Sequence, residues 1–189
     1  MTAAQPRVPR LVGAVDLGGT KIFAAIVDEH GRIVASERRP TEAALGPDAV
    51  IERMVEALRT AAASADLRTE ALHAIGVAAA GPVDAKRGMV TNPPNLPGWV
   101  EVPLVARVHA ALGLPTVLEN DANASAVGEH AFGAGRGADD MVYLTISTGI
   151  GAGIIIGGRL YAGASGAAGE VGHMTVLPDG PLCGCGRRG

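Results

Sequence analysis

The stretch Leu11-Val-Gly-Ala-Val-Asp-Leu-Gly-Gly-Thr-Lys21 decides how this chain is predicted to fold. Its first five residues are apolar, as in a buried strand, and Asp16 ends the run. Gly18 and Gly19 then predict a tight turn, and residues 21–28 read as a second strand. A glycine hairpin of this kind leaves backbone N–H groups free, and a cluster of N–H donors suits a phosphate group.

Three polar residues around this turn would complete a phosphate site. Thr20 and Lys21 supply a hydroxyl and a positive charge, and Asp16 would hold a magnesium ion through water. The spacing differs from that of a P-loop, which has four residues between its first glycine and the Gly-Lys pair. An ordinary glycine hairpin with an aspartate at the strand end remains an equal alternative for so short a motif.

The same order of elements begins again at Met141. Residues 141–146 predict a strand, 147–153 a glycine turn and 154–156 a further strand. Thr148, Gly149 and Gly151 are the candidate phosphate contacts of this turn. The turn is similar to the Gly-x-Gly of dinucleotide sites, but that motif must open a helix and the residues after this turn are strand-like. A flexible β-turn without a ligand is the alternative.

Helices are predicted between the two copies. One begins at Pro47, because the apolar residues from Val50 to Leu58 fall at helical spacing, and another begins at Pro103 and stops at Gly113. We therefore predict a duplicated architecture of two α/β lobes, residues 1–118 and 119–189. The second copy looks unfinished, so the sequence is expected to be a fragment unless something else covers the new sheet.

The composition excludes several classes of protein. The 189 residues are 48% hydrophobic with a net charge of -3 and no basic stripe, so nucleic acid is not an expected partner. No apolar run approaches the ~20 residues that cross a bilayer, and no signal peptide is recognisable, so membrane association is not expected. The two cysteines form no disulfide framework, which favours a reducing, cytoplasmic location.

A carboxylate at the junction of a strand and a helix is the candidate catalytic group. Asp121 lies in Glu119-Asn-Asp-Ala-Asn-Ala124, directly after the apolar run that begins at Pro115. A carboxylate within reach of a hydroxyl can accept its proton as that oxygen attacks phosphorus. The alternative is a simple helix N-cap. Asn120 and Asn123 favour a binding site, because their amides suit sugar hydroxyls.

A third group of polar residues lies near the end of the sequence. Glu170 and His173 supply a carboxylate and an imidazole, and Cys183 and Cys185 follow ten residues later. His173 and the two cysteines are zinc ligands of the right chemical type, although a structural zinc has four ligands and no fourth is evident. A Cys-x-Cys turn with free thiols is the alternative.

Several motifs follow one another in a fixed order along the chain. They are Asp16-Leu-Gly-Gly-Thr-Lys21, Ala80-Gly-Pro-Val-Asp84, Asn95-Leu-Pro-Gly-Trp99, Glu119-Asn-Asp-Ala-Asn-Ala124, Ser147-Thr-Gly-Ile-Gly151, Glu170-Val-Gly-His173 and Cys183-Gly-Cys-Gly186. From about Val12 to Gly189 the ordered set resembles the N-terminal part of a ROK-family sugar kinase (repressor, open reading frame, kinase), and bacterial glucokinases most closely. The resemblance implies an actin-like ATPase (ribonuclease H-like) α/β fold, with the first lobe nearly complete and the second lobe partial.

The resemblance also implies roles for particular residues. Asp121 would remove the proton from the 6-hydroxyl of a hexose, and ATP would be the phosphate donor with Mg²⁺. The other sugar hydroxyls would be bound by Asn120, Glu170 and His173, with Gly81 and Asn95 lining the same pocket. The ATP phosphates and magnesium would face two segments, Asp16 to Lys21 and Gly149 to Gly151.

The expected activity is that of a glucokinase converting glucose to glucose 6-phosphate. Fructokinase, N-acetylmannosamine kinase and N-acetylglucosamine kinase share these motifs, and a sugar-responsive transcriptional repressor is a second class in the family. Met1 to Arg10 are too short for the DNA-binding domain of such a repressor. In the family the zinc motif continues beyond the position of Gly189 with another cysteine, so the 189-residue chain alone is expected to have little kinase activity and poor zinc affinity. Relatives are commonly homo-oligomers.

Overall fold

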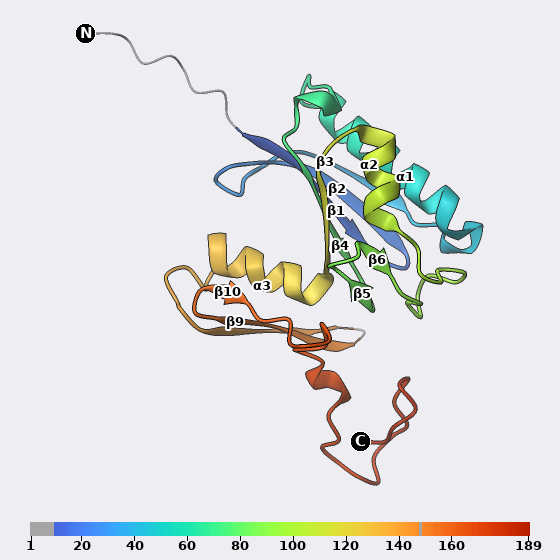
Figure 1. Ribbon diagram of the computed structural model, residues 1–189, viewed down its shortest axis with the longest axis vertical. Helices are drawn as coiled ribbons and strands as arrows, with labels where there is room; N and C mark the ends of the chain where they lie inside the picture. The colour runs from blue at the N-terminus through green and yellow to red at the C-terminus, as the bar shows by residue number, and fades with distance from the viewer. Residues whose placement is uncertain (1–9, 148) are drawn as a thin grey trace. The chain divides into compact units, whose positions relative to one another are not determined.

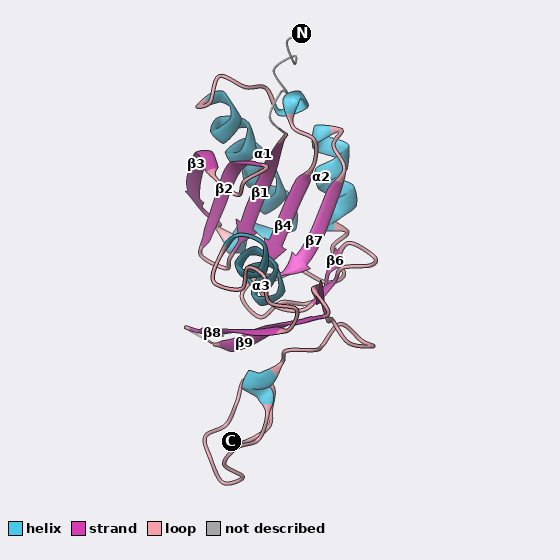
Figure 2. Cartoon of the chain, turned by 90° about the vertical axis from the view of Figure 1, so that its left-hand side faces the viewer, coloured by secondary structure: helices cyan, strands magenta, loops and turns pink. Residues whose placement is uncertain are grey.

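Five strands form the sheet of the first part of the chain. In the computed structural model, which describes residues 10–147 and 149–189, the strand order is β3-β2-β1-β4-β7. β1, β2 and β3 are an antiparallel meander, whereas β4 and β7 run parallel to β1 (Figure 2). The bounds are β1 (Leu11–Leu17), β2 (Lys21–Asp28), β3 (Ile33–Pro40), β4 (Ile75–Ala79) and β7 (Thr116–Asn120).

Two helices pack on one face of this sheet (Figure 1). α1 (Gly46–Ala63) has Pro47 in its first turn, where the missing N–H of proline costs nothing, and α2 (Leu104–Leu112) ends at Gly113 with a φ of 69°. Both predicted helices are thereby confirmed. Short elements connect the longer strands and helices: η1 (Ala43–Leu45) precedes α1, and η2 (Thr69–Ala71) and the hairpin of β5 (Val83–Asp84) and β6 (Met89–Val90) lie between α1 and α2.

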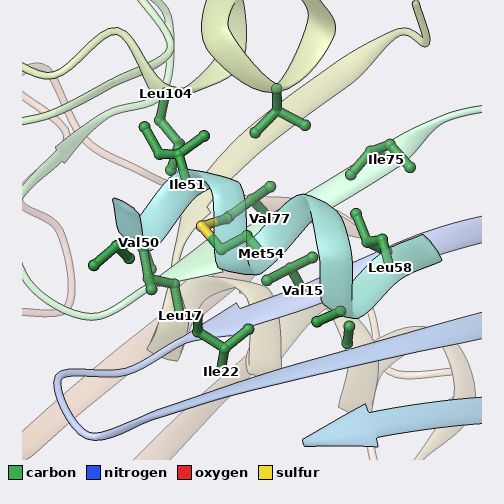
Figure 3. Close-up of a cluster of buried hydrophobic side chains, with 14 of the residues drawn as sticks. Val15, Leu17, Ile22, Val50, Ile51, Met54, Leu58, Ile75, Val77 and Leu104 are labelled. Atoms are coloured by element: carbon green, nitrogen blue, oxygen red, sulfur yellow. The ribbon is translucent and has the colours of Figure 1, made fainter. Parts of the chain in front are cut away.

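The core lies between α1 and this sheet. Met54 and Leu58 of α1 are 1% exposed and pack with Val15 and Leu17 of β1 and Ile22 of β2 (Figure 3). Successive side chains of a strand point to opposite faces of the sheet, so every second side chain faces this core. Gly13 takes part in the packing, because a Cβ there would lie 2.6 Å from Cδ1 of Ile75.

The parallel strands of this sheet end along one edge. Leu17 of β1 pairs with Ala79 of β4, and Ala79 pairs with Asn120 of β7. The segments that leave these three strands therefore begin side by side. In open α/β sheets, ligands bind outside the carboxyl ends of such strands.

The chain divides after Asp121 into two units, the second of which comprises Ala122–Gly189. The second unit has a sheet of order β10-β9-β8, with β8 (Met141–Ile146), β9 (Ile150–Ile156) and β10 (Arg159–Leu160). α3 (Asp121–Phe132) covers one face of it, and η3 (Val171–His173) follows. The other face exposes apolar side chains of β8, including Ile146 at 76%.

The glycine turn of the second unit is shorter than predicted. β9 begins at Ile150, so that Gly151 and Gly153 lie within the strand and not in the turn. The physical reason is the close approach of α3, because a Cβ at Gly153 would meet the Cβ of Ala126. Within the described residues, no helix is both long and apolar enough to span a membrane.

Candidate functional site at the strand ends

The glycine turn after β1 is held by a buried residue that follows β3. The hydroxyl of Thr41 donates to the carbonyl of Gly18 at 2.7 Å, and the N–H of Thr41 donates to the carbonyl of Thr20 at 3.0 Å. Sequence reasoning missed Thr41. The register of the hairpin could have indicated its position: Pro40 pairs with Lys21, so Thr41, which follows Pro40, lies beside the turn.

The loop carrying Asn95 lies against the same turn. A Cβ at Gly19 would lie 2.6 Å from the Cβ of Asn95 and 2.9 Å from its carbonyl oxygen, so only glycine permits this approach. The loop is closed by a hydrogen bond of 2.9 Å from the N–H of Asn92 to the carbonyl of Trp99. The indole of Trp99 is 1% exposed and anchors the loop in the core.

Gly81 and Asn120 meet at the ends of β4 and β7. The side-chain amide of Asn120 donates to the carbonyl of Gly81 at 3.3 Å. Gly81 has a φ of 94° and lies against Pro93, to whose Cβ an added Cβ would come within 2.9 Å. These contacts fix the orientation of the Asn120 amide beside Asp121, the first residue of α3.

Asp16 lies in an environment that disfavours its charged form. Burial raises the pKa of Asp16 above its ordinary value of 3.8, the negative charge of Asp121 raises it further, and Lys21 lowers it in part. The carboxylate of Asp121 disfavours the charged form of Asp16, whereas a bound divalent cation would favour the charged form of Asp16. The donor chemistry at this edge therefore fits a magnesium ion.

Glu170 and His173 lie beside the glycine hairpin of the second unit. The N–H of Ala152 in β9 donates to the carbonyl of Gly169 at 2.9 Å, and Gly172 packs so closely on the carbonyl of Ile150 that a Cβ would not fit. η3, which ends at His173, is thereby fixed against the start of β9, next to Gly149 and Gly151.

His173, Cys183 and Cys185 form a cluster whose ligand atoms all lie within 4.8 Å of one another. Nδ1 of His173 is 3.4 Å from Sγ of Cys183, and its Nε2 is 3.5 Å from Oε2 of Glu170. The pKa of Cys185 is lowered, first by the N–H of Arg187 and then by Cys183. The imidazole and the thiols have the chemistry of zinc ligands, and the Glu170 contact is the kind that orients a metal-bound histidine.

The structure thus assembles the predicted residues as two groups. The first unit brings together Asp16, the turn from Gly18 to Lys21, Gly81, Asn95, Asn120 and Asp121. In the second unit, His173 forms one cluster with Glu170, Cys183 and Cys185, and the neighbouring Gly172 contacts Ile150, which lies between Gly149 and Gly151. Thr148 lies outside the described residues.

The fold and these strand ends define an α/β chain with the actin-like ATPase fold. The ROK family model matches residues 12–189, and the chain belongs to this family.

Relatives of known name agree with this assignment. The chain is 43% identical over 175 residues to a glucokinase of Streptomyces coelicolor, covering 93% of this chain and 53% of the relative. It is 42% identical over 180 residues to an N-acetylmannosamine kinase of Citrobacter koseri, covering 93% and 58%. A ROK family glucokinase from Streptomyces griseus, solved with glucose and AMPPNP, aligns with a TM-score of 0.83 and 45% identity over 95% of this chain and 55% of the other. The chain spans about half the length of these relatives.

Proposed function

We propose that this chain supplies sugar-binding and phosphate-binding parts of an ATP-dependent hexose kinase. The observation that carries the proposal is the edge of the first sheet, where Asp16, the Gly18–Gly19 turn and Asn120 meet beside Asp121. This edge combines N–H donors for phosphate with a carboxylate that can act as a base. The glucokinase from Streptomyces griseus, solved with glucose and AMPPNP, supports the same assignment.

Asp121 is the proposed general base. Its carboxylate accepts the proton of the sugar 6-hydroxyl while that oxygen forms a bond to the γ-phosphorus of ATP, and the bond from this phosphorus to ADP breaks. The base then carries the proton, and the products are the sugar 6-phosphate and ADP. Asn120, Asn95 and Gly81 orient the sugar, and the Asn120 amide is held for this task by the carbonyl of Gly81.

The phosphates of ATP are assigned to the glycine turns. The turn from Gly18 to Lys21 offers backbone N–H groups, a hydroxyl and a positive charge, and the hairpin around Gly149 and Gly151 is the proposed second contact. When bound, Mg²⁺ neutralises negative charge on the phosphates and favours in-line transfer. Asp16 is the residue that would hold it through water.

The second unit contributes Glu170 and His173 as proposed contacts to sugar hydroxyls. His173, Cys183 and Cys185 are the proposed ligands of a structural zinc ion, which would brace this part of the pocket. Zinc affinity is measured by competition with a chromophoric chelator. We expect Cys183→Ser to weaken zinc binding at least tenfold, and equal affinity of the variant and the parent chain would exclude the site.

Glucose is the proposed substrate, because the relatives from Streptomyces coelicolor and Streptomyces griseus are glucokinases. N-acetylmannosamine is the second candidate, since an N-acetylmannosamine kinase has nearly the same identity to this chain. The two sugars differ at C2, and a pocket that pairs a given hydroxyl discriminates strongly against an analogue without it. A cytoplasmic location is proposed from the two cysteines, which form no disulfide framework, and a homo-oligomer from the resemblance to the family.

Turnover with a panel of sugars tests this function. Because the relatives are about twice as long, ADP release is measured for the chain alone and for a fusion that continues with the C-terminal half of the Streptomyces coelicolor glucokinase. We expect glucose- and ATP-dependent turnover of the fusion, with N-acetylmannosamine as the second substrate to compare. A fusion that binds nucleotide and folds, yet phosphorylates no sugar of the panel, contradicts the proposal.

A further inference from the structure

Thr41 stands out because it is a polar residue with no contact with solvent. Its side chain is 0% exposed, although the segment from β3 to η1 around it is largely at the surface. A buried hydroxyl is retained where it has a hydrogen-bond partner, since an unpaired one is costly. The partner of Thr41 is the carbonyl of Gly18, at 2.7 Å.

The hydrogen bonds of Thr41 determine which groups of the glycine turn are already occupied. Its hydroxyl donates to the carbonyl of Gly18, and its N–H donates to the carbonyl of Thr20 at 3.0 Å. The carbonyl of Lys21 accepts the N–H of Gly18 at 3.0 Å. In the part of the chain that the structure describes, the N–H groups of Gly19 and Thr20 have no hydrogen-bond acceptor.

This pattern divides the turn into two sets of groups. The carbonyl oxygens of Gly18, Thr20 and Lys21, which would repel an anion, are paired within the protein, and two N–H donors remain for an external acceptor. The turn is also confined at Gly19, where Asn95 leaves no room for a side chain. The peptide planes are therefore held between Thr41 and the Asn95 loop, and such a pre-ordered turn binds phosphate without a further ordering cost.

We propose that Thr41 is a positioning residue, whose buried hydroxyl fixes the Gly18–Gly19 turn in the form that binds phosphate. The inference rests on the proposed phosphate contact of this turn. In this proposal Thr41 increases the affinity of the turn for phosphate without touching the phosphate itself. Without the hydroxyl, the Gly18 carbonyl must find another donor, and the peptide rotates toward water. The loss of one positioning hydrogen bond predicts about tenfold weaker phosphate binding.

The test measures phosphate binding by the 189-residue chain and needs no turnover. The ¹⁵N-labelled chain is titrated with inorganic tripolyphosphate, and the amide shifts of Gly19 and Thr20 give the dissociation constant. Thr41→Val removes the hydroxyl and keeps the shape, Thr41→Ala repeats the loss without β-branching, and Thr41→Ser restores the hydroxyl. Thr69→Val is the matched control, because Thr69 is a buried threonine of η2, a segment that leads to His73, whose N–H donates to the carbonyl of Leu11 at the opposite end of β1.

We expect Thr41→Val and Thr41→Ala to weaken tripolyphosphate binding about tenfold, Thr41→Ser to bind within about twofold of the parent chain, and Thr69→Val to leave the affinity unchanged. The inference is overturned if Thr41→Val binds as tightly as the parent, if Thr41→Ser shows no recovery, or if the Thr69→Val control loses as much affinity. It is also overturned if the amides of Gly19 and Thr20 do not respond to the anion. These failures are distinct from failure of the proposed function, which is judged by sugar turnover.

Discussion

The two units repeat one strand arrangement but differ in what surrounds it. In each unit a hairpin leads to a third antiparallel strand, β1-β2-β3 in the first unit and β8-β9-β10 in the second. β1 has β4 as a parallel neighbour on its other side, whereas β8 has none among the described residues. Leu17 of β1 is 0% exposed, and Ile146 of β8 is 76% exposed. The same local pattern therefore yields a closed core only where further strands and helices pack on it.

The two hairpins also differ in the chemistry at the strand end. The next-to-last residue is Asp16 in β1 and Thr145 in β8. The first offers a carboxylate near Asp121, and the second packs beside Gly151. The two glycine hairpins therefore differ in chemistry, and we assign the proposed acid and base chemistry to the first unit alone.

The largest expected effect is on the free energy of unfolding, and it compares Leu58 in the core of the first unit with Leu144 on the exposed face of β8. Leu58→Ala removes a side chain that is 1% exposed and should lower the free energy of unfolding by about 2–5 kcal/mol. Leu144→Ala, at 55% exposure, should change it by no more than about 0.5 kcal/mol. Urea denaturation of both variants measures the difference. An equal loss for Leu144→Ala would show that the β8 face is covered in solution.

The glycine turns give a second contrast. Gly19→Ala places a methyl group against the Cβ and the carbonyl of Asn95, so the loop must shift, at a cost of about 1–3 kcal/mol. Gly149→Ala meets no atom within 4 Å and has no left-handed φ, so it should be nearly neutral for stability. Thermal unfolding and tripolyphosphate titration of the two variants check this. If Gly149→Ala is the more damaging change, the two turns are not equivalent as described.

Smaller changes in Tm are expected when Asp16 or Asp28 of the first unit is replaced by asparagine, and the two changes should have opposite signs. The pKa of Asp16 is raised by burial and by Asp121, so its charged form destabilises the fold, and Asp16→Asn should raise the Tm at pH 7. The gain shrinks as the pH falls through the raised pKa and is lost below the unfolded-state value of 3.8, where Asp16 is protonated in both states. The N–H of Arg32 is the main cause that lowers the pKa of Asp28 to about 2.

For Asp28 the sign is reversed. A depressed pKa gives stability that is present above the unfolded-state value near 3.8 and is lost as the pH falls toward 2. Asp28→Asn should therefore lower the Tm at pH 7 and leave it nearly unchanged at pH 2. Melting curves of both asparagine variants between pH 2 and pH 7 measure this. Parallel curves for the two variants would contradict the assignment of Asp16 to a charged functional edge.

Local sequence patterns predicted the elements of the first unit well. The apolar run from Leu11, the glycine turn and the proline-started helices α1 and α2 depend on neighbouring residues, and the structure has them where they were expected. Asp121 begins a helix directly after β7, as its position between an apolar run and a polar helix indicated.

Features that depend on distant residues could not be read locally. Gly153 looked like part of a turn, but it lies in β9 because α3 packs on it. Thr41 reaches the Gly18 turn only through the pairing of β2 with β3. Asn95 contacts Gly19 from a loop more than seventy residues away in the sequence, and no periodicity reports such a contact.

The most direct measurement of the central claim is the turnover of Asp121→Asn in the active fusion, with Asp66→Asn as the matched control on an exposed residue with a left-handed φ of 55°. Removal of the general base should lower kcat by about 10²–10⁴-fold with glucose and ATP, while tripolyphosphate still shifts the amides of Gly19 and Thr20. Asp66→Asn should retain full turnover. A fully active Asp121→Asn variant would contradict the assignment of this carboxylate as the base and, with it, the account of the site.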